Sequence, residues 1–224
     1  MRPDLEYLPE HSKINHITFI STTHKENGRC KANELCSIIE QLAPDVIFLE
    51  ALKDTYSEYE QYLFSEYQVF HKKLEIEALQ QYCYKSSFEY VPVLDDGMSE
   101  VFDKKYEIAT QNVELQRKIE SFNTLSAKYG FQFLNSDLSM RLQQDMRTLE
   151  KEVLYDDRLN RDAIEAIDTY ENSMLENIFS YCKTNHFSKA IFMCGVAHRK
   201  SISYKMTVMN LGREIELNWK VLKF

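Results

Sequence analysis

Pro44-Asp45-Val46-Ile47-Phe48-Leu49-Glu50 is the stretch of sequence that decides the fold. Its four consecutive large apolar residues, 46–49, suit a parallel strand that is covered on both faces of a sheet. Pro44 ends the helix that is expected just before this strand. The run closes on Glu50, whose carboxylate is costly to bury without a partner. The stretch therefore predicts a buried strand that carries an ionisable side chain at its carboxyl end.

Similar short apolar runs lie on both sides of this stretch, and segments with helical spacing separate them. The other strand candidates are 17–20, 90–94, 190–194 and the alternating segment 215–221. Helices are expected over 35–42, 54–67, 74–84 and 202–209, with Gly212 as the cap of the last. Pro92 favours an edge position or a bulge for its strand, because proline cannot donate to the ladder. Strands that alternate with helices predict an α/β fold with a mainly parallel open sheet flanked by helices.

The segment from about 99 to 186 contains no convincing strand. Apolar residues at helical spacing predict three helices within it, at about 113–125, 138–153 and 164–181. The segment lies between the third and fourth strands, so we expect it to form a helical insertion that caps one end of the sheet. The whole chain, 1–224, is then one α/β domain. Such a cap could set the size of a substrate or bind a protein partner.

Composition and charge exclude several classes of function. The chain has 224 residues and a formal net charge of -8, without a dense run of Lys and Arg. Nucleic acid is therefore not an expected partner, because duplex binding depends on neutralising phosphates. No apolar stretch is long enough to cross a membrane, and the N-terminus lacks the apolar core of a signal peptide, so a cytoplasmic protein is expected. The five cysteines show no CxxC pairing and are interpreted as reduced thiols, with Cys194, at the end of a strand, as a candidate nucleophile.

Four of the predicted strands deliver an ionisable side chain to the same edge of the sheet. The candidate catalytic residues are His24, Glu50, Asp95 and His198. Ligands of open parallel sheets bind outside the carboxyl ends of the strands. There, imidazoles and carboxylates could divide the roles of general acid and base, and His24, Glu50 and His198 could bind a divalent metal ion. Asp95 has an alternative role as a cap of the following helix. The common P-loop, GxGxxG, GxSxG and HExxH signatures are absent.

Three of these segments resemble a known superfamily, which joins erythromycin esterase, the ChaN-like haem-binding lipoproteins, the TraB/PrgY proteins and the Tiki proteases. Its marks are a GxxH after the first strand, a PDxVxLE second strand and a late second GxxH. Here they read Ser21-Thr22-Thr23-His24, Pro44 to Glu50, and Gly195-Val196-Ala197-His198. Segments 75–78 and 171–178 look like the family's Glu-bearing helix and its late helix. The resemblance covers about 15–95 and 170–222 and leaves the insertion unmatched.

The chain also departs from this pattern at three places. Ser21 stands in place of the first glycine, and Asp96 stands where an arginine often follows the third-strand Asp in the TraB branch. The arginine that usually precedes the late-helix Met is not evident. An arginine would normally orient an anionic or carbonyl group.

The resemblance implies hydrolysis of an ester or amide bond in a small-molecule or peptide substrate. In an esterase-like mechanism His24 acts as the general base, with Glu50 and His198 orienting it or polarising the carbonyl. In a Tiki-like mechanism the same three residues bind a divalent metal ion that lowers the pKa of its water. The departures favour an alternative, a non-enzymatic module that binds a haem-like ligand or a protein partner. The partner version predicts an exposed apolar stripe on the 99–185 helices.

Overall fold

The strands form one five-stranded sheet in the order β3-β2-β4-β1-β5. The computed structural model describes residues 14–53, 73–211 and 215–224. The strands are β1 (Asn15–Thr22), β2 (Val46–Leu52), β3 (Glu89–Leu94), β4 (Lys189–Gly195) and β5 (Leu217–Val221). Each neighbouring pair within these residues is parallel, which confirms the predicted α/β fold with an open sheet. The expected helix 54–67 and Gly212, the residue expected to end the helix 202–209, lie outside the described residues.

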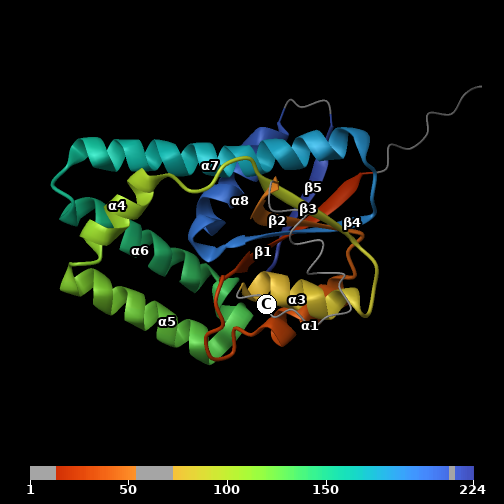
Figure 1. Cartoon of the computed structure of the whole chain (residues 1–224), viewed down its shortest axis with the longest axis horizontal. Coiled ribbons are helices and arrows are strands. Elements are labelled where there is room, and N and C mark those ends of the chain that lie inside the picture. Colours follow the sequence, from red (N-terminus) through yellow and green to blue (C-terminus); the bar gives the residue numbers. More distant parts are fainter. Residues whose placement is uncertain (1–13, 54–72, 212–214) are drawn as a thin grey trace, which may run out of the picture.

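Helices cover both faces of the sheet (Figure 1). Helices α1 (Ala32–Leu42) and α3 (Leu74–Cys83) pack on one face, and α7 (Asp157–Thr184) and α8 (Arg199–Asn210) pack on the other. The packing of strand β2 explains why its sequence from Val46 to Leu49 is an unbroken apolar run. Ile47 and Leu49 join the core on the α1 and α3 side, whereas Val46 and Phe48 join the core on the α7 and α8 side. Both faces are buried, as a strand inside a doubly covered parallel sheet requires.

Strand β3 is an edge strand, as Pro92 predicts. Its pairing with β2 also shifts register between Leu49 and Leu52, so the strand combines an edge position with an irregularity. At the other edge, the burial of β5 alternates along the strand, which agrees with the half-buried strand expected from the alternation of apolar and polar residues.

The insertion between β3 and β4 consists of α4 (Glu100–Ala109), α5 (Val113–Leu134), α6 (Asp137–Val153) and α7. Helix α4 is not among the helices expected from the sequence. Helix α7 is longer than predicted: its first half lies with the cap, and its second half covers the sheet (Figure 1). At 28 residues it is the longest described helix, yet no described helix combines the length and the apolar character needed to cross a membrane.

A buried polar network joins the cap to the sheet. Asn135, at the junction of α5 and α6, accepts a hydrogen bond from the backbone N–H of Ser21 and donates one to the Ser21 carbonyl. The guanidinium of Arg199 donates to Ser21, Asn135 and the Leu222 carbonyl. Because Arg199 directly follows His198, this network also fixes the short 3₁₀ helix η2 (Val196–His198), which presents His198.

Candidate active site

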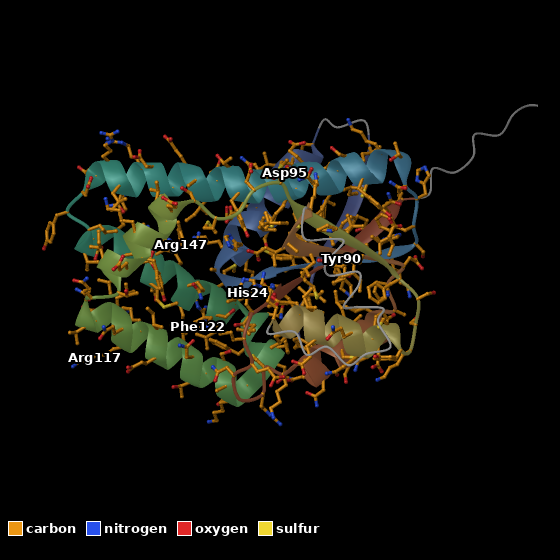
Figure 2. All side chains as sticks on the ribbon, in the orientation of Figure 1. His24, Tyr90, Asp95, Arg117, Phe122 and Arg147 are labelled. Atoms are coloured by element: carbon orange, nitrogen blue, oxygen red, sulfur yellow. The ribbon has the colours of Figure 1, made fainter. Side chains whose placement is uncertain are left out.

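The carboxyl ends of β1, β2 and β4 bring three of the predicted site residues together. Strand β4 lies between β1 and β2 in the sheet, so the turn at Gly195 is flanked on both sides. A Cβ atom on Gly195 would lie 3.4 Å from Glu50 Oε2, 3.7 Å from His198 Cδ2 and 4.0 Å from His24 Nε2. All three side chains line one cavity between the sheet edge and the cap. Figure 2 shows His24 at this junction.

Each imidazole is held by a buried carboxylate from a helix. His24 Nδ1 lies 3.0 Å from Glu75 Oε1, and His198 Nδ1 lies 2.9 Å from Glu171 Oε1. A carboxylate at Nδ1 fixes the ring orientation and the tautomer, and it stabilises the protonated ring. Nδ1 of each ring is thereby engaged, and the other ring nitrogen, Nε2, remains for chemistry. We call these pairs the His24–Glu75 dyad and the His198–Glu171 dyad.

The His24–Glu75 dyad is the more accessible of the two. The His24 side chain is 46% exposed, whereas that of Glu75 is 3% exposed. Thr22 Oγ1 also donates to Glu75 Oε1, at 2.8 Å, and so fixes the carboxylate from the end of β1. The hydrogen bond to Glu75 raises the pKa of His24 above its ordinary value, although partial burial opposes the shift. His24 is therefore a stronger base than a free imidazole.

The His198–Glu171 dyad is buried more deeply. Burial opposes ionisation of Glu171, but hydrogen bonds from His198 and Ser201, together with the charge of Lys205, lower its pKa below the ordinary value. The ammonium of Lys205 lies 3.1 Å from Glu171 Oε2. Glu171 thus remains a carboxylate that can support a positive charge on His198.

Glu50 lies between the two dyads. Its Oε2 accepts the Gly195 N–H at 2.7 Å, and its Oε1 accepts the Tyr170 hydroxyl at 2.7 Å and lies 3.8 Å from His198 Nε2. Burial raises the pKa of Glu50, but the two imidazoles and these hydrogen bonds outweigh it, so the net shift is downward. Glu50 is therefore a buried anion beside both rings.

Cys194 lies next to Glu50 and His198 but is a poor nucleophile. Burial, followed by the charge of Glu50, raises its pKa well above the ordinary thiol value, so the reactive thiolate is disfavoured. Glu50, Cys194 and His198 nevertheless offer ligand atoms within 4.8 Å of one another. Carboxylate, thiolate and imidazole are the ligands of protein zinc sites, so this donor set fits such an ion. His24, which the sequence suggested as a ligand, is not part of that set.

Asp95 lies apart from the other candidate residues. Its carboxylate accepts hydrogen bonds from Lys53 Nζ at 2.7 Å, Ser173 Oγ at 2.9 Å and Asn177 Nδ2 at 2.8 Å. The bond from Lys53, followed by that from Asn177, lowers the pKa of Asp95 from 3.8 to about 2. Asp95 is not among the described residues that line the cavity. Ser99, rather than Asp95, caps the following helix.

The cavity has a volume of about 1010 Å³ and is closed on one side by the cap. All four helices of the insertion contribute to its walls. The large apolar side chains of the cap wall are Met98, Phe102, Tyr106, Ile119, Phe122, Met146, Ile164 and Ile167. Arg147 of α6, which is labelled in Figure 2, also lines it and donates to the carbonyl of Ala197, the residue before His198. The helical insertion and the strand ends that carry the site residues therefore line the same cavity.

Sequence reasoning left three contributors to this site without a role. Glu75 and Glu171 fall in the segments that resemble the superfamily, but nothing there identified them as partners of the histidines. One signal was available for Glu171, because it shares helical spacing with the apolar Met174 and Ile178 and a charge on a buried face needs a partner. Tyr170 carried no such signal.

Comparison with protein-family models finds no matching family, and comparison with curated proteins finds no relative. Among solved structures, an erythromycin esterase mutant in its open conformation is similar to this chain, with a TM-score of 0.41 and 12% sequence identity. The similarity covers 93% of this chain and 69% of that one.

Proposed function

We propose that the protein hydrolyses an ester or amide bond with a water molecule activated by His24. The observation that carries this proposal is the pair of dyads on either side of Glu50 at the base of one cavity. In each dyad a carboxylate occupies Nδ1, which is the arrangement that lets Nε2 of an imidazole accept and return a proton. The raised pKa of His24 supports the choice of this ring as the base.

The proton balance of the reaction follows from this arrangement. His24 Nε2 takes a proton from water as the water oxygen bonds to the carbonyl carbon. Glu75 stabilises the imidazolium that forms, and the anionic Glu50 lies close enough to contribute. When the tetrahedral intermediate collapses, the bond to the leaving oxygen or nitrogen breaks, and His24 returns the proton to that atom. His198, whose Nδ1 is held by Glu171, polarises the carbonyl in this proposal.

A divalent metal ion is the alternative means of activation. Glu50, Cys194 and His198 would hold it, and Cys194 would have to lose its proton to do so. When bound, such an ion lowers the pKa of its water and supplies a nucleophile at neutral pH. The carboxylate on His198 Nδ1 suits either role, because ligating histidines usually have such a partner.

Turnover of a small panel of esters and amides tests the proposal directly. We expect release of nitrophenol from p-nitrophenyl acetate, butyrate or octanoate, or of nitroaniline from the matching anilides, above the rate in buffer. The assay is repeated after dialysis against a chelator, with the metal content measured before and after. Activity that survives dialysis assigns activation to His24 alone, and activity restored by Zn²⁺ assigns it to the metal. If no member of the panel is cleaved above the rate in buffer, the hydrolase proposal is contradicted.

Asp95 has a structural role in this proposal, because its carboxylate ties Lys53, after β2, to α7. Asp95→Asn is expected to change turnover by less than about twofold and to lower the free energy of unfolding by less than about 1 kcal/mol, since the ion pair is half exposed. The pKa of Asp95 is lowered in the folded state, so the stabilisation is present above the ordinary pKa of 3.8 and is lost as the pH falls towards about 2. Urea unfolding of both proteins at pH 6 and pH 2 measures this, with Asp96→Asn as the control. A large loss of turnover at unchanged stability would place Asp95 in the catalytic machinery.

A further inference from the structure

An ion pair between a buried lysine and a partly buried glutamate lies in the cap wall of the cavity, away from the two dyads. Lys105 of α4 is 5% exposed, and its ammonium lies 3.5 Å from Glu150 of α6, whose side chain is 16% exposed. Both residues line the same cavity as His24 and Glu50. In Figure 1, α4 lies beyond the strand ends, at the far end of the cap from the sheet. The two dyads and this ion pair thus come from different parts of the fold.

The hydrogen-bonding capacity of this pair is largely unused. An ammonium group has three donors, and a carboxylate has about four acceptor positions. Within the described residues, the 3.5 Å contact is the one polar contact that the structure gives either charged group. Buried ions are stable when they are paired and also hydrogen-bonded, so this pair has spare donors and acceptors at a cavity wall.

The surroundings of the pair restrict what can bind it. Apolar side chains come from every helix of the cap: Phe102, Tyr106, Ile119, Phe122, Met146 and Ile164. Two of them, Tyr106 and Ile164, remain 46% and 52% exposed. An apolar ligand body would cover these side chains and gain from their burial. A ligand with only apolar groups would leave the Lys105 and Glu150 side chains without further partners.

The charge of the pair restricts the ligand further. The opposite charges of Lys105 and Glu150 largely cancel, so neither a ligand anion nor a ligand cation gains a net attraction to the pair. A neutral group that both accepts and donates satisfies both residues at once. A hydroxyl or an amide has this property.

We propose that Lys105 and Glu150 form a subsite for a hydroxyl or amide group at the far end of an apolar substrate. The ammonium donates to the oxygen of this group, and the group donates its hydrogen to the carboxylate. The apolar chain then runs through the cap towards the dyads, where the scissile carbonyl lies. This inference rests on the proposed function for the reacting end, whereas the subsite itself requires only the cavity.

Binding of ketone probes, which cannot be hydrolysed, tests the subsite without any need for turnover. Calorimetry compares 2-octanone, 2-decanone and 2-dodecanone with their terminally hydroxylated counterparts. At the chain length that spans the cavity, the hydroxyketone is expected to bind about tenfold more tightly than its parent, because the hydroxyl completes hydrogen bonds to two charged groups. Equal affinities at all three lengths would overturn the proposal.

Variants of the pair separate recognition from a merely structural role. Lys105→Met combined with Glu150→Leu is expected to fold, because apolar replacement of a buried ion pair is often neutral or stabilising, and to lose the preference for the hydroxyketone. Exchange of the two charges, Lys105→Glu with Glu150→Lys, keeps a donor beside an acceptor and should recover part of that preference. Loss of the exposed pair in Arg158→Ala with Asp162→Ala should leave the preference unchanged. The same preference in all four proteins would show that the pair only joins α4 to α6.

The p-nitrophenyl esters of octanoic and 8-hydroxyoctanoic acid separate the two proposals. If the ketones are discriminated but neither ester is hydrolysed, the proposed function fails and the subsite stands. If both esters are hydrolysed at equal kcat/KM and the ketones bind equally, the subsite fails alone.

Discussion

His24→Ala is expected to lower kcat for ester hydrolysis about 10³-fold, with a much smaller change in KM. The variant loses the group that takes the proton from water, whereas the cavity walls that bind the rest of the substrate are unchanged. His24 is half exposed and its ring belongs to no core cluster, so the fold should survive the change. Steady-state kinetics with the most active ester of the panel, together with a urea unfolding curve, measure both effects. His186→Ala, at an exposed histidine outside the cavity, is the matched control.

A second variant, at Glu75, separates the role of His24 as the base from the contribution of its carboxylate partner. Glu75→Gln keeps the shape of the side chain and an oxygen for Thr22 and His24, but it removes the negative charge. We expect kcat to fall by about 10- to 100-fold, because the imidazolium loses the charge that stabilises it. Wild-type turnover in His24→Ala would exclude His24 as the base. A large loss in His24→Ala without any loss in Glu75→Gln would retain the base and remove the dyad from the mechanism.

The strands of the sheet were predictable because each is marked by a short apolar run in its own sequence. The run from Val46 to Leu49 is solid because both faces of β2 are buried, and Pro92 marks β3 as an edge. The order of the strands was not predictable, because it depends on pairings between residues far apart in the chain. The packing of α4 against α7 likewise depends on contacts between segments far apart in the chain.

The site also contains residues that the local sequence predicts and residues whose positions depend on packing. His24 and His198 follow β1 and β4, and Glu50 lies near the carboxyl end of β2. Parallel strands necessarily bring their carboxyl ends to one edge. Glu75 and Glu171 reach that edge from helices, and which face of a helix meets the edge is set by packing rather than by the local sequence. Asp95 shows the converse case. It also follows a strand, but that strand, β3, is at the edge of the sheet, and the Asp95 carboxylate binds Lys53 and α7 instead.

The 3₁₀ helix that carries His198 depends on Arg199, a residue that strand ends do not point to. Arg199 is 2% exposed, and its guanidinium donates four hydrogen bonds, to Ser21 Oγ, to Asn135 Oδ1 and O, and to Leu222 O. All four acceptors are uncharged, and burial lowers the pKa of Arg199. A buried cation without a directly bonded carboxylate is tolerated here because neutral oxygens replace the water that it loses. These oxygens come from β1, the α5–α6 junction and the C-terminal segment.

Arg199→Met is therefore expected to lower the free energy of unfolding by about 3–5 kcal/mol, because several buried acceptors lose their donor at once. The loss is limited by Asn135 Oδ1, which keeps the hydrogen bond from the Ser21 N–H. Arg199→Lys should fall between the two proteins, since one ammonium cannot reach all four acceptors. Urea unfolding followed by circular dichroism measures the change, and Lys200→Met, at the exposed neighbour, should alter stability by less than about 0.5 kcal/mol. Equal stability of Arg199→Met and Lys200→Met would show that the network does not hold the cap on the sheet. If Arg199→Met is less stable but still folded at low temperature, its turnover should also fall, because the residue that it replaces fixes the backbone that presents His198.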